Sequence, residues 1–576
     1  MARNYQKDVF KTRCSLVTAF LLVLFAVITG RLFYLQIIHG KNAREAAKEQ
    51  HSIYRKLSPS RGEIKLSGQS SLETFPVATN IQKYLVYAVP QEIQNSKLAA
   101  AALAKTLNLE EKDILLKITD QAKKYVPIKK QLSEQEQQEI KALNLPGLYF
   151  DAESARVYPQ GSLLSQTLGF VGFKGDAKAG LYGLEKFFEK DLAGSSGTLK
   201  EEKDVSGAWI FGSNRELVPA VDGVNLVLTV DKTLQFKAES VLKDAVEKNS
   251  ADSGSILVVN PKTGAILAIA NFPDFNPNEY NKATDSKVFL NEAVTGNYEP
   301  GSVFKPITMA AGIDAGKVAP DSTYNDTGEV VEADGHKIKN SDGKAHGMQT
   351  MVQVLDASLN TGAVYVKEQI GNSGFLKYVK AFGFGDKTGI ELPEAKGNLD
   401  GLKGDIKVNY DTASFGQGIS ATPLQLVQAF TAIANQGAMM KPYIVQSKIY
   451  SDGRAENISP QIVRQVISQK AANTVAAMMV DVVENGHGKR AGVPGFYIAG
   501  KTGTAQVPKQ NSKGYEENNN IGSFIGFGPV ENPQFLMLVR VNHPRDVKFA
   551  ETTAAPAFGE MAKFILDYYH IPPTRK

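Results

Sequence analysis

The feature that most constrains this chain is an uncharged apolar run close to its N-terminus. Residues 14–30 read CSLVTAFLLVLFAVITG, seventeen residues without a charge, and mostly apolar residues continue past Arg31 to Ile38. A helix needs about 20 apolar residues to cross the bilayer core, a length that this segment reaches if Arg31 extends its charge toward the head groups. We therefore expect one transmembrane helix over residues 14–38.

A cleaved signal peptide and a buried core helix are the alternatives for this run. Cleavage requires small residues around the site, whereas the run continues into the bulky sequence RLFYLQII. Residues 1–13 carry four basic side chains against Asp8, an excess that favours a cytoplasmic N-terminus. No later segment has eighteen uncharged apolar residues. We therefore expect a single-pass cell-membrane protein whose remaining chain is extracytoplasmic.

Charge and cysteine content exclude several classes of function. The net charge is +5, of which +3 lies in the first thirteen residues, so the other 563 residues carry only +2. This balance is too small for a chain built around nucleic-acid binding. The one cysteine, Cys14, excludes an intrachain disulfide and any CxxC metal or redox site. The seven histidines are scattered, and His487 in N-G-H-G is typical of a turn, so no histidine triad or metal cluster is expected.

Two regions follow the apolar run. Residues 39–222 are charge-rich and contain no catalytic cluster, with helices expected over 98–109 and 132–143 and a strand over 84–89. From residue 223 a strand, a helix of about fifteen residues and a hairpin follow one another. Strands return near the C-terminus, and a final helix is expected after Pro556. Strands early and late around a helical middle predict an α+β domain over residues 223–576. The expected strands are 255–260, 265–271, 496–499, 523–528 and 535–541, and the expected helices are 424–435, 471–484 and 557–569.

Gly301–Lys305, GSVFK, is the first of three segments that could carry chemistry. Ser302 at a helix N-terminus and Lys305 three residues later share one helical face. The free N–H groups of the helix end favour an oxyanion, and a partly desolvated lysine can activate a serine as its base. Pro306 fits only if the helix begins at about this point. Ser240 and Lys243 have the same spacing, but we expect them on the surface of an amphipathic helix.

The other two segments are Ser358-Leu359-Asn360 and Lys501-Thr502-Gly503-Thr504. A hydroxyl and an amide two residues apart can point into one cavity, although such a turn in isolation more commonly only caps a helix. Lys501 is expected in a strand flanked by small residues, where a substrate backbone can lie along the strand edge. A lysine with two threonine hydroxyls then forms a carboxylate clamp. Two further K-T-G sequences, at 262–264 and 387–389, lie in predicted loops.

In this order the three segments resemble the S-x-x-K, S-x-N and K-T-G motifs of penicillin-binding proteins and serine β-lactamases. The sequences EPGSVFKP, FGQG with TPLQ, and GKTGTAQ resemble class B penicillin-binding proteins in particular; they lie at 299–306, 415–418, 422–425 and 500–506. RGEI, RVYPQG and GLE resemble the pedestal motifs of that family; they lie at 61–64, 156–161 and 183–185. This chain departs from the family at Lys65-Leu66-Ser67-Gly68, where an Asp-Arg-Asn-Gly-like turn is usual.

The resemblance implies an α+β protein in four parts. These are a cytoplasmic tail (1–13), a transmembrane anchor (14–38), a mixed α/β non-catalytic, dimerisation-like pedestal (39–222) and a transpeptidase domain (223–576). The transpeptidase domain is expected to hold an antiparallel sheet with helices on both faces. The implied activity is the cross-linking of peptidoglycan stem peptides ending in D-Ala-D-Ala, without a metal or organic cofactor, and β-lactams are implied as covalent inhibitors.

The resemblance also implies a role for each site residue. Ser302 would form the acyl-enzyme with Lys305 as base, and the oxyanion would lie between the backbone N–H groups of Ser302 and Thr504. Ser358 would pass a proton to the leaving amine, and Lys501 would hold Ser358 and the terminal carboxylate. Asn360 would bind the substrate amide and orient Lys305. Thr502, Gly503 and Thr504 would line the substrate, with both threonine hydroxyls on its carboxylate.

Several alternatives remain open at this stage. The amino-acid sequences of the active-site segment and of S-L-N-T-G favour a septal, division-type protein over an elongation-type one. A D,D-carboxypeptidase or β-lactamase-like hydrolase would need to activate water for deacylation, and no matching glutamate motif is recognisable. A membrane scaffold or β-lactam sensor is the non-enzymatic alternative, although the motifs are intact. The layout implies a membrane glycan polymerase and divisome or elongation proteins as partners.

Overall fold

The computed structural model describes residues 2–40, 52–69, 73–175, 177–202, 216–332, 335–509, 514–545 and 549–575. The chain divides into two compact units. The first comprises residues 1–59 and 194–222, and the second comprises residues 60–193 and 223–576.

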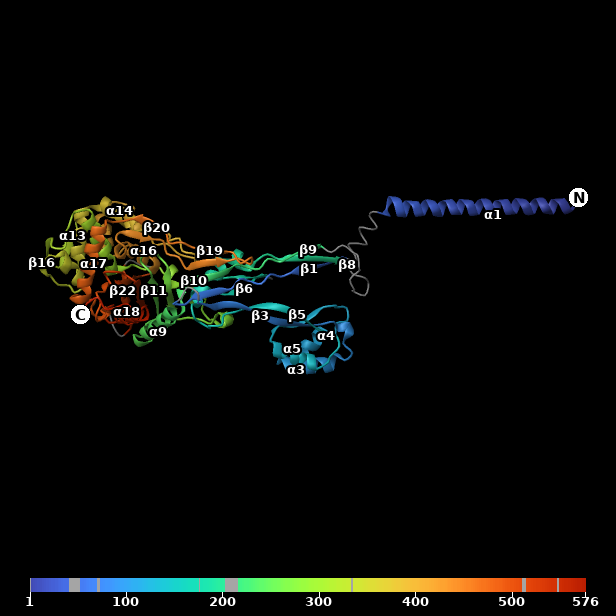
Figure 1. Ribbon diagram of the computed structural model, residues 1–576, viewed down its shortest axis with the longest axis horizontal. Coiled ribbons are helices and arrows are strands. Elements are labelled where there is room, and N and C mark those ends of the chain that lie inside the picture. The colour runs from blue at the N-terminus through green and yellow to red at the C-terminus, as the bar shows by residue number, and fades with distance from the viewer. Residues whose placement is uncertain are drawn as a thin grey trace. The chain divides into compact units, whose positions relative to one another are not determined.

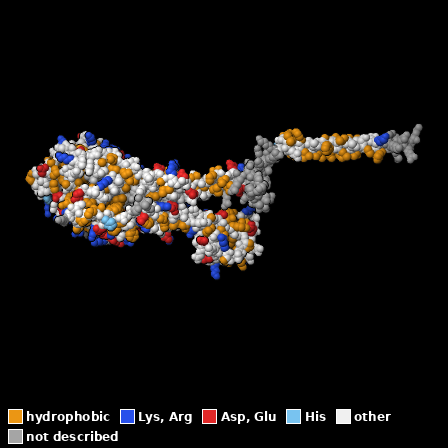
Figure 2. All heavy atoms as spheres, in the orientation of Figure 1, with side chains coloured by type: hydrophobic (Ala, Val, Ile, Leu, Met, Phe, Trp, Pro, Cys, Tyr) orange, Lys and Arg blue, Asp and Glu red, His pale blue; other side chains and the backbone are white. Residues whose placement is uncertain are grey.

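The first unit contains the N-terminal helix and a small sheet. Helix α1 (Ala2–Phe33) continues into a π-helical turn, η1 (Tyr34–Ile38), and apolar side chains cover much of the part whose side chains are described (Figure 2). Val9–Ile38 has a mean hydropathy of 2.3 and is exposed, so among the described residues it is the one helix long and apolar enough to cross a membrane. The unit's three strands form an antiparallel sheet in the order β1-β8-β9: β1 (Ser52–Leu57), β8 (Gly197–Glu202) and β9 (Glu216–Val218).

The N-terminal part of the second unit is built on a mixed sheet in the order β19-β18-β10-β2-β3-β4, with β5 also paired to β3 (Figure 1). All its pairs are antiparallel except β10 with β2. The first strand of the predicted transpeptidase domain, β10, thus shares a sheet with pedestal strands. The strands are β2 (Ile64–Ser67), β3 (Thr74–Ala88), β4 (Val126–Leu132), β5 (Leu148–Val157), β10 (Asn225–Asp231), β18 (Val445–Ile449) and β19 (Ala455–Asn457).

Three helices pack on β3 and β4 around a separate apolar core. Asn95 caps the first of them through a hydrogen bond from Leu98 N–H, and Ser133 with Glu136 forms a capping box at the third. Both predicted helices of this region are confirmed, but the second begins after its cap rather than at Leu132. The helices are α3 (Ser96–Leu107), α4 (Glu111–Ile118) and α5 (Glu134–Ala142). Smaller elements are η2 (Pro90–Glu92), α6 (Ser165–Leu168), β6 (Val171–Lys174), β7 (Ala177–Gly180), α7 (Gly183–Phe187) and α8 (Glu189–Ala193).

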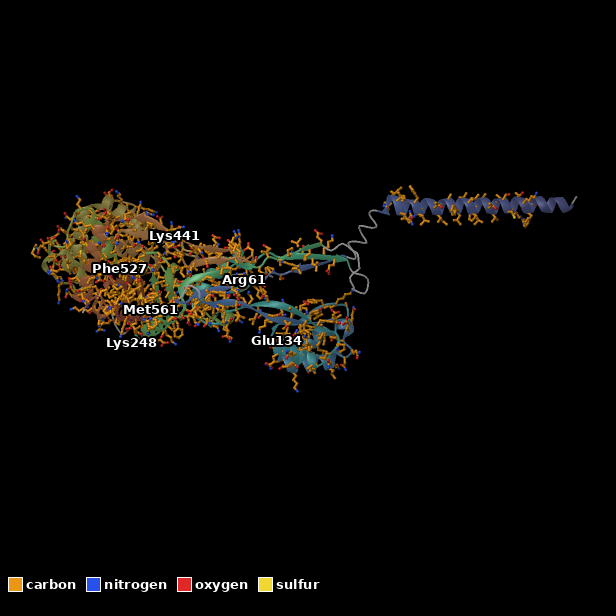
Figure 3. The ribbon with its side chains drawn as sticks, viewed as in Figure 1. Arg61, Glu134, Lys248, Lys441, Phe527 and Met561 are labelled. Atoms are coloured by element: carbon orange, nitrogen blue, oxygen red, sulfur yellow. The ribbon has the colours of Figure 1, made fainter. Side chains whose placement is uncertain are left out.

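The three pedestal motifs singled out in the sequence meet at one buried carboxylate, that of Glu185. Its side chain is fully buried and lies 2.7 Å from Arg61 and 2.7 Å from Arg156. Arg61, labelled in Figure 3, also pairs with Glu189 at 2.6 Å. The hydroxyl of Tyr158 donates a further hydrogen bond to Glu185, over 3.2 Å. Motifs more than a hundred residues apart are therefore parts of one ion network, and removing one partner would leave a buried charge uncompensated.

The atypical segment Lys65–Gly68 extends a strand. Lys65, Leu66 and Ser67 belong to β2 and pair with β3, and Ser67 Oγ donates to the carbonyl of Val230 over 3.1 Å. Gly68 N–H then donates to the carbonyl of Glu73, which joins the end of β2 to the residue before β3.

The C-terminal part of the second unit holds a fully antiparallel five-stranded sheet in the order β12-β11-β23-β22-β21. The second and third strands of the predicted domain thus share a sheet with its last three, which agrees with strands early and late around a helical middle, whereas its first strand, β10, belongs to the other sheet. The strands are β11 (Ser253–Val259), β12 (Ile266–Phe272), β21 (Ala499–Pro508), β22 (Tyr515–Gly528) and β23 (Phe535–Asn542).

Both faces of this sheet are covered, because successive strand residues point to opposite sides. Leu536 and Leu538 of β23 belong to one apolar core, and Met537 and Val539 belong to another. Helices α9 (Lys232–Lys248) and α18 (Ala554–Tyr568) cover the second face, and the central helices cover the first. Phe527 and Met561, labelled in Figure 3, belong to the first and second core respectively. The predicted layering is confirmed.

The remaining elements surround this sheet. The central helices are α10 (Glu292–Thr295), α11 (Lys305–Asp314), α12 (Met351–Asp356), α13 (Asn360–Ile370), α14 (Asn372–Ala381), α15 (Lys407–Ala413), α16 (Pro423–Ala434) and α17 (Gln469–Glu484). The 3₁₀ turns are η3 (Pro277–Lys282), η4 (Ser286–Phe289), η5 (Gly301–Phe304), η6 (Asp400–Leu402) and η7 (Lys489–Ala491). Paired short strands are β13 (Thr323–Asp326) with β16 (Gly347–Thr350), β14 (Glu329–Val331) with β15 (Lys337–Lys339), and β17 (Ala438–Met440) with β20 (Ile462–Gln465).

Several predicted boundaries are wrong. The strands expected over 84–89 and 523–528 begin earlier, at Thr74 and Tyr515. The strand expected over 496–499 begins only at Ala499, so residues 496–498 precede β21. The last helix begins at Ala554, two residues before Pro556 rather than after it. Proline is tolerated in a first helical turn, because the N–H that it lacks would have no partner there.

Candidate active site

Ser302 lies in a 3₁₀ turn, η5, that runs directly into α11 at Lys305. The structure thus places the serine one turn before the predicted helix start. A 3₁₀ turn has three residues per turn, so Ser302 and Lys305 still share one face. Ser302 is partly exposed, whereas Lys305 is only 1% exposed. Pro306 occupies the first turn of α11, as its sequence position predicts.

The F-G-Q-G segment contacts the backbone of this turn at Gly301. Gly301 has a φ of +58° and donates its N–H to the carbonyl of Gly416 over 3.0 Å. Gly416 has a φ of +83°, and a Cβ there would lie 2.3 Å from the carbonyl oxygen of Gly301. Only glycine permits both the left-handed backbone and the close approach. The second resemblance segment therefore shapes the backbone that carries Ser302.

Ser358 follows helix α12 in a left-handed conformation, with a φ of +55°, and α13 begins at Asn360. The N–H groups of Ser358 and Leu359 donate to carbonyls of the last turn of α12. The S-x-N segment is therefore a helix-ending turn, the reading favoured for such a triplet in isolation. It also places the hydroxyl of Ser358, whose residue is 9% exposed, between two lysines.

Both predicted catalytic lysines meet at Ser358. Lys501 Nζ donates to Ser358 Oγ over 2.9 Å, and Lys305 Nζ donates to the same oxygen over 3.2 Å and also to the Ser358 carbonyl. Burial, together with the neighbouring Lys501, lowers the pKa of Lys305 well below its ordinary value. Burial lowers the pKa of Lys501 to about 7. The charge of Lys501 thus disfavours the ammonium form of Lys305 and favours its neutral amine.

Strand β21 presents the third motif. Lys501 pairs with Ile525 of β22, and β21 has no strand on its other side among the described residues. Gly503 lies against the Ser302 turn, since a Cβ there would be 2.7 Å from Val303 Cγ1 and 3.1 Å from Val303 N. Thr502 Oγ1 accepts a hydrogen bond from Lys501, and Thr504 Oγ1 accepts one from Ala550 N–H. As an acceptor, each hydroxyl keeps its own proton to donate to a further group.

Two expected contacts are not among the described hydrogen bonds. Asn360 donates its side-chain N–H to the carbonyl of Lys339 over 2.8 Å, and no described hydrogen bond joins it to Lys305. Ser358 and Lys501, rather than Asn360, surround the Lys305 amine here. Likewise, no described hydrogen bond joins the Ser302 hydroxyl to Lys305. Hydrogen bonds of this kind often tighten only when substrate is bound.

Sequence reasoning missed a buried polar group that holds the S-x-N turn. Asn340 Oδ1 accepts the backbone N–H of Asn360 over 3.0 Å and that of Thr361 over 3.2 Å, which caps α13. Asp326 accepts hydrogen bonds from the side chains of Asn340 and Thr361, over 2.8 Å each. These residues lie in short, polar stretches without periodicity, so no local signal pointed to them.

The alternative S-x-x-K and K-T-G sequences lie outside the cluster of predicted catalytic residues. Ser240 and Lys243 are exposed on α9, as predicted. Gly264 of the first alternative K-T-G lies in the turn between β11 and β12. In the second, Thr388 is bound to Glu394 and, together with Lys387, lines a separate cavity of about 260 Å³ that contains none of the predicted catalytic residues.

Comparisons with known proteins agree with this geometry. Residues 254–563 match the family model described as penicillin binding protein transpeptidase domain, and residues 56–228 match the penicillin-binding protein dimerisation domain. Stage V sporulation protein D of Bacillus subtilis (strain 168) is 36% identical over 98% of this chain and 87% of its own length. Peptidoglycan D,D-transpeptidase FtsI of Buchnera aphidicola subsp. Schizaphis graminum is 30% identical over 98% of this chain and 95% of its own length.

The fold is also that of a solved relative. The crystal structure of penicillin binding protein 2X from Streptococcus thermophilus superposes with a TM-score of 0.76, over 89% of this chain and 80% of that one, at 24% identity. The transpeptidase and dimerisation matches together cover most of the chain beyond its N-terminal helix. The chain therefore belongs to the class B penicillin-binding proteins, the peptidoglycan D,D-transpeptidases that join a dimerisation-type module to a transpeptidase domain.

Proposed function

We propose that this protein is a membrane-anchored serine D,D-transpeptidase that cross-links peptidoglycan stem peptides through an acyl-enzyme on Ser302. The observation that carries the proposal is the convergence of two buried lysines on one hydroxyl, that of Ser358, beside the turn that presents Ser302. One lysine comes from α11 and the other from β21. The open edge of β21 then offers a place for an extended stem peptide.

Acylation begins with a proton transfer from Ser302. The neutral amine of Lys305 accepts the proton of the Ser302 hydroxyl while Oγ attacks the carbonyl carbon of the penultimate D-Ala. The resulting oxyanion is held by the backbone N–H groups of Ser302 and Thr504. Its proximity to the N-terminal end of η5 and α11 adds a favourable dipole. The lowered pKa of Lys305 supports this role, because it favours the neutral amine that a base requires.

The leaving D-Ala requires a proton, and Ser358 is placed to deliver it. Its hydroxyl lies between Lys305 and Lys501, so a proton taken from Ser302 can pass through Ser358 Oγ to the leaving amine. Lys501 keeps Ser358 oriented and attracts the terminal carboxylate of the stem peptide, which Thr502 and Thr504 bind through their hydroxyls. Gly503 leaves room for the peptide, and Asn360 binds its amide.

An amino group of a neighbouring stem peptide then attacks the ester and releases Ser302, which forms the cross-link. A β-lactam would follow the first half of this route, and the opened ring would leave a slowly hydrolysed ester on Ser302. We propose transpeptidation over hydrolysis because the chain pairs its catalytic domain with a dimerisation-type module and an apolar N-terminal helix.

We propose that the N-terminus is cytoplasmic, that the catalytic domain is extracytoplasmic, and that the protein acts at the septum with a membrane glycan polymerase. The basic residues before the apolar helix support this orientation. A role in spore formation is a second candidate, favoured by the 36% identity to a protein named for stage V of sporulation. Depletion in the source cell separates the roles: filaments indicate division, rounded cells elongation, and failed spores sporulation.

Labelling with a fluorescent penicillin and peptide mapping tests the catalytic assignment. We expect label on Ser302 in the full-length protein and none in Ser302→Ala, whereas Ser240→Ala, the surface serine with the same spacing, should label normally. Label on Ser240, or none on the folded wild-type protein, would refute the proposal. Cross-linking of lipid-linked glycan strands then distinguishes a transpeptidase from a hydrolase, since a hydrolase would only trim stem peptides.

A further inference from the structure

A row of polar side chains crosses one buried face of the five-stranded sheet and has no role in the mechanism above. Ser255 of β11 and Ser523 of β22 lie directly opposite Arg540 of β23, one on each side of it. Ser523 in turn lies opposite Gly503, the glycine of the K-T-G motif. Residues that are opposite one another on neighbouring strands lie on the same face of a sheet, so this row leads from Arg540 to the strand that carries Lys501.

The side chain of Arg540 is a buried cation without a close carboxylate. The residue is 6% exposed, and the carboxylate oxygen that pairs with it, on Glu292, lies 3.8 Å away on a side chain that is 42% exposed. Arg540 Nε is buried and has no hydrogen-bond partner among the described residues. Burying a guanidinium in this way is costly, and an apolar side chain of similar volume is often at least as stable at such a position. Core packing by itself therefore does not explain an arginine here.

The guanidinium contacts the segment that enters the Ser302 turn. Its central carbon lies 4.5 Å from the centre of the Tyr298 ring, and its Nη1 donates to the carbonyl of Gly296 over 3.2 Å. Gly296 directly follows α10, and Tyr298 lies four residues before Ser302. A Cβ at Gly296 would lie 2.8 Å from Arg540 Nη1, so the backbone of this segment packs directly on the guanidinium. An aromatic ring attracts a cation above its face, and more strongly where water is excluded.

The same segment is also bonded to the helical layer. The backbone N–H of Tyr298 donates to the carbonyl of Ala421 over 3.1 Å, and Ala421 N–H donates to the Tyr298 carbonyl over 3.0 Å. Ala421 leads into helix α16. Within the sheet, Ser523 Oγ donates to the carbonyl of Gly503 over 3.4 Å, from the position directly opposite Arg540. Arg540 therefore joins this segment to strands β23 and β22, and β22 pairs with β21.

We propose that Arg540 is a positioning residue for acylation, whose guanidinium fixes the segment before Ser302 at a set distance from the strand that carries Lys501. The role depends on the proposed function, because this distance matters only if Ser302 attacks a substrate held along β21. No described contact joins Arg540 to Ser302, so the guanidinium acts through Tyr298 and Gly296. Its loss should let Ser302 move relative to a bound substrate, and a displacement of about 1 Å can cost about 100-fold in rate.

Saturation kinetics of acylation by a fluorescent penicillin, measured on the full-length protein in detergent and normalised to the folded fraction, test this role. We expect Arg540→Met to lower the rate at saturating penicillin about tenfold or more, because Ser302 is misplaced, and to leave the half-saturating concentration within about threefold, because β21 still binds the ligand. Arg540→Lys keeps a cation that can lie over the Tyr298 ring and should react at least about threefold faster than Arg540→Met. A structural role alone would lower the folded fraction and leave both constants of the folded protein unchanged.

A double-mutant cycle tests the contact between Arg540 and Tyr298. Tyr298→Leu removes the ring and should slow acylation about as much as Arg540→Met does. The double variant should lie within about threefold of the slower single variant, because both changes remove the same contact. Tyr298→Phe keeps the ring and should react within about threefold of the wild type. A wild-type saturating rate in Tyr298→Leu, or losses that multiply in the double variant, would overturn the proposal, and the first of these results decides even if Arg540→Met does not fold.

Arg156→Met is the matched control, because Arg156 is also a buried arginine but pairs with Glu185 in the pedestal, 2.7 Å away. It should destabilise the protein without changing the saturating rate of the folded fraction. A rate loss in Arg540→Met no larger than in this control would reject the positioning role. If the folded wild-type protein takes no penicillin label at all, the proposed function itself fails, and the role of Arg540 falls with it. Normal labelling of the wild type with an unaltered rate in Arg540→Met would instead reject the positioning role alone.

Discussion

Gly503→Ala should slow the acylation of the folded protein in addition to lowering its stability. The added Cβ would lie 2.7 Å from Val303 Cγ1 and 2.8 Å from Ser523 Oγ, so about 0.7 Å of movement is needed to reach the 3.4 Å of an ordinary contact. Val303 N lies 3.1 Å away on the same side and belongs to the turn that presents Ser302. The movement therefore separates β21 from the attacking serine. A misplacement of about 1 Å can cost about 100-fold in rate, so we expect acylation to slow about 10- to 100-fold.

Gly500→Ala is the matched control on the same strand. Residues three apart in a strand point to opposite faces, and a Cβ at Gly500 would meet the ring of Phe524 at 2.4 Å, within the core beneath α9 and α18. Both substitutions overfill a packed site, so each should lower the free energy of unfolding by about 1–3 kcal/mol. Only Gly503→Ala disturbs the Ser302 turn.

The assay is the second-order rate constant for acylation by a fluorescent penicillin, normalised to the folded fraction from a thermal unfolding curve. Gly500→Ala should retain the wild-type constant within about threefold, an effect under 1 kcal/mol. Equal losses in the two variants would show that general loosening of the sheet, rather than the distance from β21 to Ser302, sets the rate. A wild-type constant in Gly503→Ala would refute the geometric argument altogether.

Three further predictions concern charge and positioning. A lysine in the unfolded chain keeps its proton to about pH 10, whereas native Lys501 loses its proton above about pH 7. Between these pH values the unfolded state binds more protons, so the free energy of unfolding should rise with pH by up to about 4 kcal/mol. Lys501→Met should abolish this pH dependence, as measured from the unfolding midpoint. Glu185→Gln should cost about 3–5 kcal/mol in unfolding free energy, because Arg61 and Arg156 lose a buried partner, while the penicillin reactivity of the folded fraction stays at the wild-type level. Asn340→Ala should cost about 1–2 kcal/mol through loss of the α13 cap and should slow acylation about tenfold by loosening Ser358; unchanged acylation would remove Asn340 from the site.

Much of the fold was predictable because it depends on local periodicity. The short apolar runs of β11, β12 and β23 indicated strands, and the helix-like stretches of α16 and α17 indicated helices close to their final bounds. The errors fall at ends, where local signals compete. Pro556 reads as a helix start but occupies the first turn of α18, and the strand expected from residue 496 begins at Ala499.

The features of the site likewise divide into those that the sequence predicted and those that it did not. Spacing alone placed Ser302 with Lys305, and strand chemistry alone placed Lys501 with Gly503, because the two residues of each pair are only two or three positions apart in the chain. That Lys501 would reach Ser358 could be expected only from resemblance to a family. The capping of Asn360 by Asn340 had no sequence signal, because it joins residues from separate loops whose order along the chain says nothing about their distance.

The sequence by itself determined the apolar N-terminal helix, the α+β order of the catalytic domain and the three motifs, because a run length, a period and a short spacing are properties of neighbouring residues. Only the tertiary structure decided which lysines share Ser358, how closely β21 approaches the Ser302 turn, and that Asn340 caps α13. These depend on packing between α11, α12, α17 and β21, elements up to about two hundred residues apart in sequence. The charge states of the site follow from that packing, since burial and neighbouring charges, rather than residue type, set the pKa of a lysine or a carboxyl group.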